Sequence, residues 1–427
     1  MKAFTALAAL ALLPLSVLVL AFALLRTPDA PPPPPPDGPP VVVTRTVDPD
    51  DVKPLPGYLQ QSLAWLAEAQ FESGGWGAGL HTAQHVRDPH AVQMDPATTA
   101  FAALALLRAG STPDDGPYAR NVRRALDYLV GVVEAAPANS ARITTIEGTQ
   151  PQVKLGRNID AALAAQFFTA VLPHLDGQLK RRTEAALDKC LLAIQRGQAA
   201  DGSQGEGGWA PVLQSAMAAS ALERAEAAGR DVDDEALARS REYQRGNVSV
   251  YTDGAGAPSV SVDASAGAGV ALYAASAGQR ATAQEAREAE EAVRDALGEG
   301  AEVTEEALRR AGRSEADAAR LYDAYTRNAA TADLLASDEI WSGFGNNGGE
   351  EFLSYMMTSE SLVIAGGDAW DRWHARLVNL FGSIQNGDGS WSGHHCITSP
   401  VFCTAAVILA LTADRDRTLL AHELQRG

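Results

Sequence analysis

The sequence is poor in cysteine, in aromatic residues and in positive charge. It has only 3 cysteines in 427 residues, which is few for an exported protein. Aromatic residues make up 6% of the chain against 46% hydrophobic residues, so the core must be largely aliphatic and alanine-rich, which favours helices. Lys and Arg number 35 against 53 Asp and Glu, a net charge of −18. This balance argues against nucleic acid as a partner and against docking on anionic lipid, because both need clustered basic residues.

The first 26 residues contain an uncharged run from Ala3 to Leu25. As a helix this run would be roughly 35 Å long, enough to cross a bilayer. We therefore predict a signal anchor at residues 1–26, which makes this a single-pass membrane protein. Lys2 on one side and the acidic residues after Arg26 on the other favour a domain on the extracytoplasmic side. The alternative is a cleaved signal peptide, for which Ala21-Phe22-Ala23 offers a small-x-small site.

A proline-rich linker is predicted at residues 27–57. It contains six consecutive prolines, Pro31 to Pro36, followed by Pro39-Pro40. Such a run forms a polyproline II spacer of about 3.1 Å per residue, which would hold a folded domain away from the membrane. That domain is predicted at residues 58–417, with a C-terminal tail at 418–427.

Three glycine–tryptophan signatures indicate an internal repeat. The first runs from Gln70 to Trp76, the second ends at Trp209, and the third runs from Gln385 to Trp391. The tryptophans lie 133 and 182 residues apart, about two and three steps of roughly 60 residues. We interpret them as units one, three and six of an array, in which each tryptophan packs between neighbouring units and each glutamine bonds exposed backbone groups.

Each unit is predicted to be a helix, a glycine-rich loop and a second helix. In the first unit, Asp95 caps an apolar helix that ends at Gly110. In the fourth, the second helix is expected to end at Gly278. The stretch 279–312 is rich in Ala, Glu and Arg, and is either an inserted helical hairpin or part of a long solvated outer helix.

The two motifs QxxxGGW and QNGDGSW resemble the repeats of squalene–hopene cyclases and protein prenyltransferase β subunits. The resemblance implies an all-α fold, an (α/α)6 toroid over about Tyr58 to Arg417, in which each unit contributes one inner and one outer helix. It specifies activity less closely, because a fold of this kind can support different functions.

Two catalytic motifs of those enzymes differ in this sequence, in their position or in their residues. Asp231-Val232-Asp233-Asp234 matches the DxDD string of the cyclases, but it lies where Asp233 or Asp234 would cap an outer helix. The prenyltransferases bind zinc through an Asp, a Cys and a His. Phe402-Cys403-Thr404 stands in the region where their histidine is expected, so that ligand set is not reproduced and no metal or other cofactor is predicted.

Polar residues at the N-terminal ends of the inner helices are expected to gather at one mouth of the central cavity. Each of these residues taken singly is an ordinary helix cap, and together they form a mildly acidic rim around the cavity mouth. The candidates are His394, His395, Cys396, Glu350, Glu351, Tyr355, Asn158, Asp160 and Asp263. Cys396 and Cys403 allow a disulfide, a metal or catalytic role, or a packed loop with free thiols.

The function predicted from these observations is that of a binding or scaffolding module, which is tethered to the membrane by its N-terminal helix. Its partner would be an unknown protein or an apolar ligand. The alternative is an enzyme that acts in the toroid cavity on an isoprenoid, in the manner of a terpenoid cyclase or prenyltransferase, or on a glycan.

Overall fold

The structure is a computed structural model that describes residues 52–252, 254, 258–342, 345–366 and 368–416, with two short strands, β1 (Val41–Val43) and β4 (Glu423–Gln425). Contacts divide the chain into two units, residues 1–41 with 425–427 and residues 42–424, and the fold below is that of the second. The predicted anchor at 1–26 lies outside the described residues, as do most of the linker and of the tail. Within the described part of the chain, no helix has both the length and the apolar character to span a membrane.

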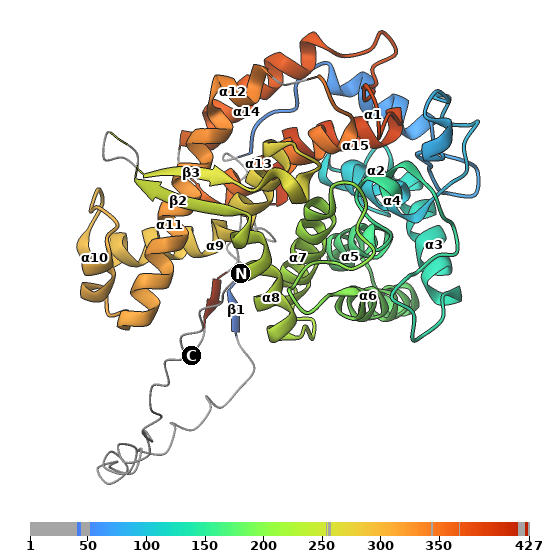
Figure 1. The fold of residues 1–427 in the computed structure, drawn as a ribbon. Coiled ribbons are helices and arrows are strands. Elements are labelled where there is room, and N and C mark those ends of the chain that lie inside the picture. The colour runs from blue at the N-terminus through green and yellow to red at the C-terminus, as the bar shows by residue number, and fades with distance from the viewer. Residues whose placement is uncertain are drawn as a thin grey trace, which may run out of the picture. The chain divides into compact units, whose positions relative to one another are not determined.

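Six helices are buried over most of their length, because apolar and small residues cover them on nearly all sides. These inner helices are α2 (Pro96–Arg108), α5 (Ile159–Val171), α7 (Pro211–Ala227), α9 (Ala271–Leu297), α13 (Gly349–Ala365) and α15 (Pro400–Leu411). Each contacts the next one along the chain, and α15 contacts α2, so the six helices form a closed cycle of contacts (Figure 1). The prediction of an all-α fold is confirmed.

A second set of helices alternates with the first along the chain. These outer helices are α1 (Leu59–Glu68), α3 (Ala119–Ala135), α6 (Gly177–Gly197), α8 (Asp234–Gly246), α11 (Glu315–Ala336) and α14 (Asp368–Ser383). They are amphipathic, and each buries one face, as α3 does against α2 and α8 does against α7 and α9. Because α1 packs on α15, the first outer helix lies beside the last inner one.

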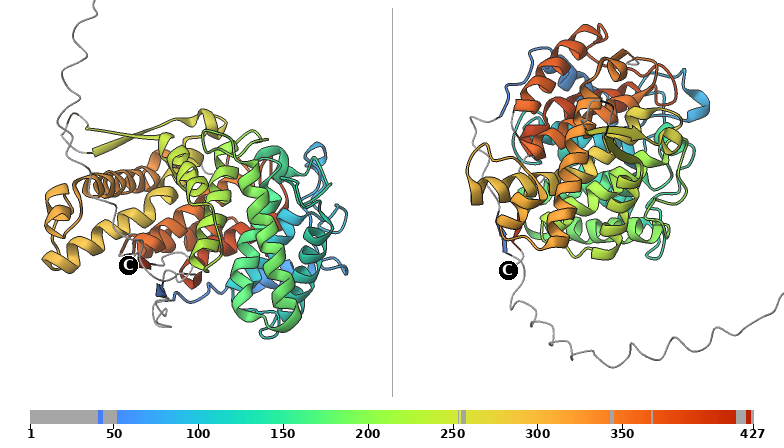
Figure 2. Two further views of the ribbon diagram at one scale, coloured as in Figure 1. Left: turned by 90° about the horizontal axis from the view of Figure 1, so that it is seen from below. Right: turned by 60° about the vertical axis from the view of Figure 1, so that its left-hand side comes forward.

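The remaining elements are short. They are the helices α4 (Gln150–Lys154), α10 (Glu305–Arg310) and α12 (Asp338–Ser342), the 3-10 turns η2 (His81–Ala83), η3 (Leu172–His174), η4 (Ala264–Gly267) and η5 (Ala413–Asp416), and the strands β2 (Val248–Thr252) and β3 (Pro258–Val262). The two strands pair antiparallel, with Val248 opposite Val262 and Thr252 opposite Pro258. This hairpin, which the sequence did not lead us to expect, lies along α11 (Figure 2).

The fourth inner helix is longer than predicted. It does not stop at Gly278 but continues to Leu297, and Asp263 caps the turn η4 that precedes it. A β-carbon at Gly278 would lie 2.5 Å from Val248 Cγ2, so this glycine lets the hairpin approach the helix rather than ending it. Residues 279–312 consequently comprise the second half of α9, a loop and α10, which pack with α11 around a separate small apolar cluster.

Trp76 and Trp391 occupy equivalent places in the first and last units. Both are buried, and each indole Nε1 donates to the carbonyl oxygen ten residues earlier, Leu66 at 2.8 Å and Phe381 at 3.0 Å. In both loops the glutamine six residues before the tryptophan bonds a glycine carbonyl inside the loop. These contacts fix the tight reversal between the outer and inner helices.

The prediction that Trp209 is packed like the other two is wrong, since this residue is 58% exposed. The third loop follows the same pattern in a different register. Gln198 Nε2 donates to Gly202 O at 3.4 Å, and the residue six positions after Gln198 is the buried Gln204. Gln204 N donates to Ser215 Oγ at 2.9 Å, as Trp391 N donates to Thr404 Oγ1 at 3.0 Å. A glutamine therefore stands in the tryptophan position of unit three.

The Asp231–Asp234 string lies on the outside of the fold, as predicted. Its three aspartates are exposed, and Asp233 is the N-cap of the outer helix α8, where its Oδ1 accepts from Glu235 N at 2.9 Å and Ala236 N at 3.3 Å. An alkene-protonating acid needs an apolar cavity around it, and an exposed carboxylate that caps a helix has none.

Candidate functional site

The N-terminal ends of the inner helices lie side by side, and the loops that precede them form what we call the loop face. Ala97 N of α2 donates to Asp160 Oδ1 of α5 at 3.0 Å, and Asn158 N donates to Gln214 Oε1 of α7 at 2.7 Å. Gly349 N of α13 donates to Ile397 O, just before α15, at 2.7 Å. Polar residues from different units are therefore brought together on this face.

Five of these residues, which we call the Cys396 cluster, meet at one point: Lys154, Tyr273, Glu350, His395 and Cys396. Lys154 Nζ lies 3.3 Å from Glu350 Oε1, 3.7 Å from Cys396 Sγ and 5.6 Å from the centre of the Tyr273 ring. His395 Nδ1 lies 2.9 Å from Cys396 Sγ. Four members are buried and His395 is exposed, so the cluster reaches solvent through this histidine.

The loop before α15 holds Cys396 in a constrained conformation. Its φ is +60°, a left-handed value that a residue with a side chain rarely adopts, and such strain is concentrated at functional sites. Cys396 N donates to Gln84 Oε1 at 3.0 Å, and Gln150 Oε1 of α4 accepts from Thr398 N at 2.7 Å. A β-carbon at Gly393 would lie 2.0 Å from Ile397 O, so this close turn requires glycine.

Burial sets the protonation of the cluster. It raises the pKa of the Cys396 thiol, an effect that Glu350 reinforces and Lys154 opposes. Burial likewise raises the pKa of the Tyr273 phenol, with Glu350 adding to the shift. Beside the cluster, burial raises the pKa of Glu351 to about 7, although backbone N–H groups of Gly345 and Asn347 oppose the shift. In its resting state the cluster therefore contains a neutral thiol rather than a thiolate.

Glu350, His395 and Cys396 place three ligand-type atoms within 4.8 Å of one another. The Lys154 ammonium, however, lies beside both Glu350 and Cys396 and already supplies a positive charge there. A divalent cation in the same place would be repelled by this ammonium unless the lysine lost its proton. The donor set does not favour a metal for this reason.

The other predicted site residues are not members of the cluster. Exposed His394 contacts the His395 ring, and Glu351 accepts from Gly345 N at 3.1 Å. Tyr355 packs against Trp341 and Trp373 between α13 and the outer layer, and Asp263 is an exposed cap, so neither belongs to the cluster.

The disulfide that the sequence allowed between Cys396 and Cys403 is not formed, and all three cysteines are buried free thiols. The two sulfur atoms have different surroundings, because Cys403 Sγ lies 3.7 Å from Ile397 O.

Sequence reasoning missed Lys154, Tyr273 and Gln84. Arg157, the basic residue nearest to the start of α5, lies at the surface and pairs with Glu147 at 3.3 Å. The buried base is Lys154, three residues earlier. A lysine just before the apolar helix α5 was the available signal, since a lysine there must find a buried partner or reach solvent.

Asp95 and Asp160 form a second polar feature of the loop face. Asp95 caps α2 and accepts from Thr98 N at 2.8 Å and Ala78 N at 2.9 Å. Burial raises the pKa of Asp95 to about 6, and burial together with the Asp95 charge raises that of Asp160 to about 7. Because both folded-state values exceed the unfolded value, the folded state binds more protons, and its stability falls as pH rises through this window.

We expect Asp160→Asn to reduce this pH dependence. Between pH 5 and pH 7 the free energy of unfolding of the wild type should fall by roughly 2 kcal/mol more than that of the variant, because only the wild type must ionise this buried carboxyl. Urea unfolding at the two pH values measures the difference, and Asp234→Asn, at an exposed carboxylate, is the control. A gap between wild type and Asp160→Asn that stays constant with pH would contradict the assignment.

A buried ionic network lies among the inner helices, and we call it the Glu360 network. Glu360 Oε1 of α13 lies 3.0 Å from the guanidinium of Arg108 on α2 and 2.7 Å from that of Arg224 on α7. Arg280 of α9 lies 3.8 Å from Glu360 Oε2, and Asp416 pairs with Arg108 at 2.9 Å and also with Arg224. Burial alone would raise the pKa of Glu360, but the three guanidinium groups outweigh it and lower that pKa.

The network links most of the inner helices. Glu223 of α7 pairs with Arg280 at 2.8 Å and with the partly exposed Arg241 at 3.1 Å, so four arginines face Glu223, Glu360 and Asp416. Arg108 also donates to Leu409 O of α15 at 3.3 Å, which means that side chains or backbone from five of the six inner helices take part. The side chains of Arg108, Arg224 and Glu360 are each no more than 2% exposed, so the core of this network is closed to solvent.

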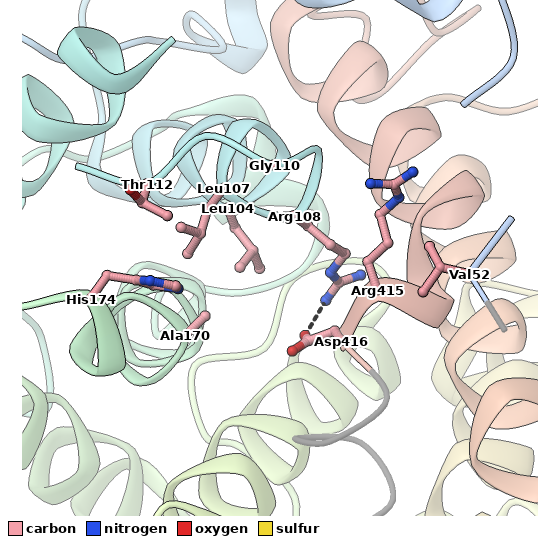
Figure 3. Close-up of a pocket in the computed structure, with 10 residues that line it drawn as sticks. All are labelled: Val52, Leu104, Leu107, Arg108, Gly110, Thr112, Ala170, His174, Arg415 and Asp416. Atoms are coloured by element: carbon pink, nitrogen blue, oxygen red, sulfur yellow. Dashed lines mark hydrogen bonds and ion pairs between the residues drawn. The ribbon is translucent and has the colours of Figure 1, made fainter. Parts of the chain in front are cut away.

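A pocket of about 380 Å³ lies beside this network, at the C-terminal ends of α2 and α5. Figure 3 shows Leu104, Leu107 and Ala170 on one side and the ion-paired Arg108 and Asp416 on the other. The pocket contains none of the residues of the Cys396 cluster.

Comparison of the sequence with protein-family models and with curated proteins gives no match, so the family resemblance stays a prediction.

Proposed function

We propose that residues 58–417 form an (α/α)6 toroid of the type found in squalene–hopene cyclases and protein prenyltransferases, and that this toroid is a binding or scaffolding module. The closed cycle of contacts among α2, α5, α7, α9, α13 and α15 supports the toroid. The matching hydrogen bonds of the Gln70, Gln198 and Gln385 loops support the repeat. The tether to the membrane and the extracytoplasmic location rest on the sequence of residues 1–26.

The observation that carries the proposal is the Glu360 network. An isoprenoid cyclase or transferase needs an apolar cavity that can enclose its substrate. In this chain Glu360, Arg108 and Arg224, each no more than 2% exposed in its side chain, occupy the space between the inner helices. Charged groups paired in this way are costly to separate, so they oppose the entry of an apolar chain.

The loop face offers a surface for a protein partner. We define the aromatic patch as Leu80, His81 and Trp209. Leu80 is 43% and Trp209 is 58% exposed, and the His81 and Trp209 rings meet edge to face with their centres 5.1 Å apart. Trp209 N donates to Val153 O at 3.2 Å, so a hydrogen bond fixes the backbone that carries the indole. Exposed tryptophan on a fixed backbone is typical of binding surfaces.

Photo-crosslinking in cells that produce the full chain tests this proposal. We expect p-benzoylphenylalanine at position 209 to give a light-dependent adduct of one discrete mass, and Leu80→Asp to abolish the adduct. The same group at position 251, where Tyr251 is 52% exposed on the β2–β3 hairpin, is the matched control and should give none. Absence of an adduct at 209, or equal adducts at both positions, would refute a binding role for the aromatic patch.

The second candidate is an enzyme, and the contact between His395 and Cys396 favours it. An imidazole nitrogen 2.9 Å from a thiol can take the proton of that thiol as a general base. Such an enzyme would use a thiol nucleophile at the loop face. Loss of a detected activity in Cys396→Ser, with retention in Cys403→Ser, would establish this candidate over the first.

A further inference from the structure

We propose that Lys154 Nζ and Cys396 Sγ join in a reducible covalent nitrogen–sulfur bond when a hydroperoxide oxidises Cys396. The inference is independent of the binding role proposed above. It rests on the geometry of the Cys396 cluster, where a buried amine and a buried thiol from distant parts of the chain approach each other.

The two reacting atoms are already close. Lys154 Nζ lies 3.7 Å from Cys396 Sγ, although the residues are 242 positions apart. Lys154 is 3% and Cys396 is 6% exposed, so neither side chain can swing away into solvent without disturbing its surroundings. The amine belongs to α4, before the second inner helix, and the thiol belongs to the loop before the last one.

The loop geometry favours reaction at Cys396 over the other thiols. Exposed His395 provides the route from solvent and, through Nδ1 at 2.9 Å, a base for the thiol proton. The hydrogen bond from Cys396 N to Gln84 Oε1 fixes the strained backbone, which keeps the sulfur beside the amine. Cys190 and Cys403 are fully buried, and burial strongly raises the pKa of each thiol. They serve as internal controls.

The chemistry proceeds in two balanced steps. In the first, Cys396 gives its proton to His395, the thiolate sulfur attacks one peroxide oxygen, the O–O bond breaks, and the products are a sulfenic acid and water. In the second, Lys154 passes a proton toward Glu350, 3.3 Å away, and the neutral amine attacks the sulfur. The S–O bond breaks, water leaves, and an S–N bond remains. The sulfur loses two electrons, which the peroxide takes up, and the joined residues have lost two hydrogens.

The S–N bond would connect two distant segments of the loop face. It would link unit two to unit six through one covalent contact and close a long loop of chain. Crosslinks of this kind restrict the unfolded chain, so the oxidised protein should unfold at a higher temperature than the reduced one. A thiol reductant should reverse both the bond and the shift.

The experiment uses the full chain, purified in detergent and treated with graded hydrogen peroxide. Tryptic mass spectrometry should recover the Lys154 and Cys396 peptides as one species, two hydrogens lighter than their sum and uncut at Lys154. Lys154→Arg keeps a cation beside Glu350 but has no amine that can react, so it should give no such species and no rise in melting temperature. Cys396→Ser should behave likewise, and Cys403→Ser should behave as the wild type.

Two outcomes would overturn the proposal. One is recovery of Cys396 as a sulfinic or sulfonic acid, or as an unchanged thiol, with trypsin cutting normally at Lys154. The other is a crosslinked species that persists in Lys154→Arg, which would assign the bond to a different nitrogen. Circular dichroism of each variant before oxidation shows whether it is folded, and Cys396→Ser provides the second route if Lys154→Arg is not.

Discussion

Replacing Glu360 by glutamine should lower the free energy of unfolding by about 3–5 kcal/mol, the usual cost of removing one partner from a buried ion pair. Glu360 is 1% exposed and faces Arg108, Arg224 and Arg280. Glutamine has nearly the same shape, so the change removes the charge and leaves the three guanidinium groups with less compensation. Equilibrium urea unfolding of wild type and variant measures the effect.

The control is Glu235→Gln on α8. Glu235 is 89% exposed in its side chain and pairs with Arg239 only at 3.7 Å. Solvent screens such a pair, so the variant should unfold almost as the wild type does. A loss below about 1 kcal/mol in Glu360→Gln would show that the arginines are not held by this carboxylate, and that the interior of the ring is open to water.

Trp391→Ala and Trp76→Ala should each cost about 3–5 kcal/mol, whereas Trp209→Ala should leave stability nearly unchanged. The first two indoles are at most 1% exposed, and each donates a hydrogen bond to a helix carbonyl. Trp209 is 58% exposed, so its removal creates no cavity. Thermal and urea unfolding of the three variants measure the differences.

The comparison contains its own control, because the three substitutions are chemically identical and only the burial of the side chain differs. A loss at Trp209 as large as that at Trp391 would contradict the register that assigns Gln204, and not Trp209, to the tryptophan position of unit three. A small loss at Trp76 would contradict the equivalence of units one and six.

The sequence predicted the regular parts of the fold because local physical chemistry determines them. Asp95 before an apolar helix is a strong cap signal, and the structure confirms the cap through Thr98 N. The register of the loop containing Trp209 was predicted wrongly because its tryptophan was matched to Trp76 and Trp391 without regard to its distance in sequence from Gln198. Six residues separate glutamine from tryptophan in the first and last loops, against eleven from Gln198 to Trp209.

The candidate site was predicted in part. His395 and Cys396 could be found by position because they precede the inner helix α15, and Glu350 because it lies in the first turn of α13. Lys154 and Tyr273 could not, because their meeting with Cys396 depends on the closed cycle that brings units two, four and six together. The role of Gly278 could not be predicted either, because glycine is needed there for a close contact with Val248, which lies in another element of the fold.

We propose that the buried ion pairs of the Glu360 network keep an apolar substrate out of the space between the inner helices. Native mass spectrometry of the purified full chain, stripped of lipid and titrated with squalene and with geranylgeranyl diphosphate, tests it most directly. We expect no one-to-one complex above that formed with a straight-chain hydrocarbon of similar mass. A stoichiometric complex with either isoprenoid, formed by wild type in preference to that hydrocarbon, would contradict it and establish the enzyme reading.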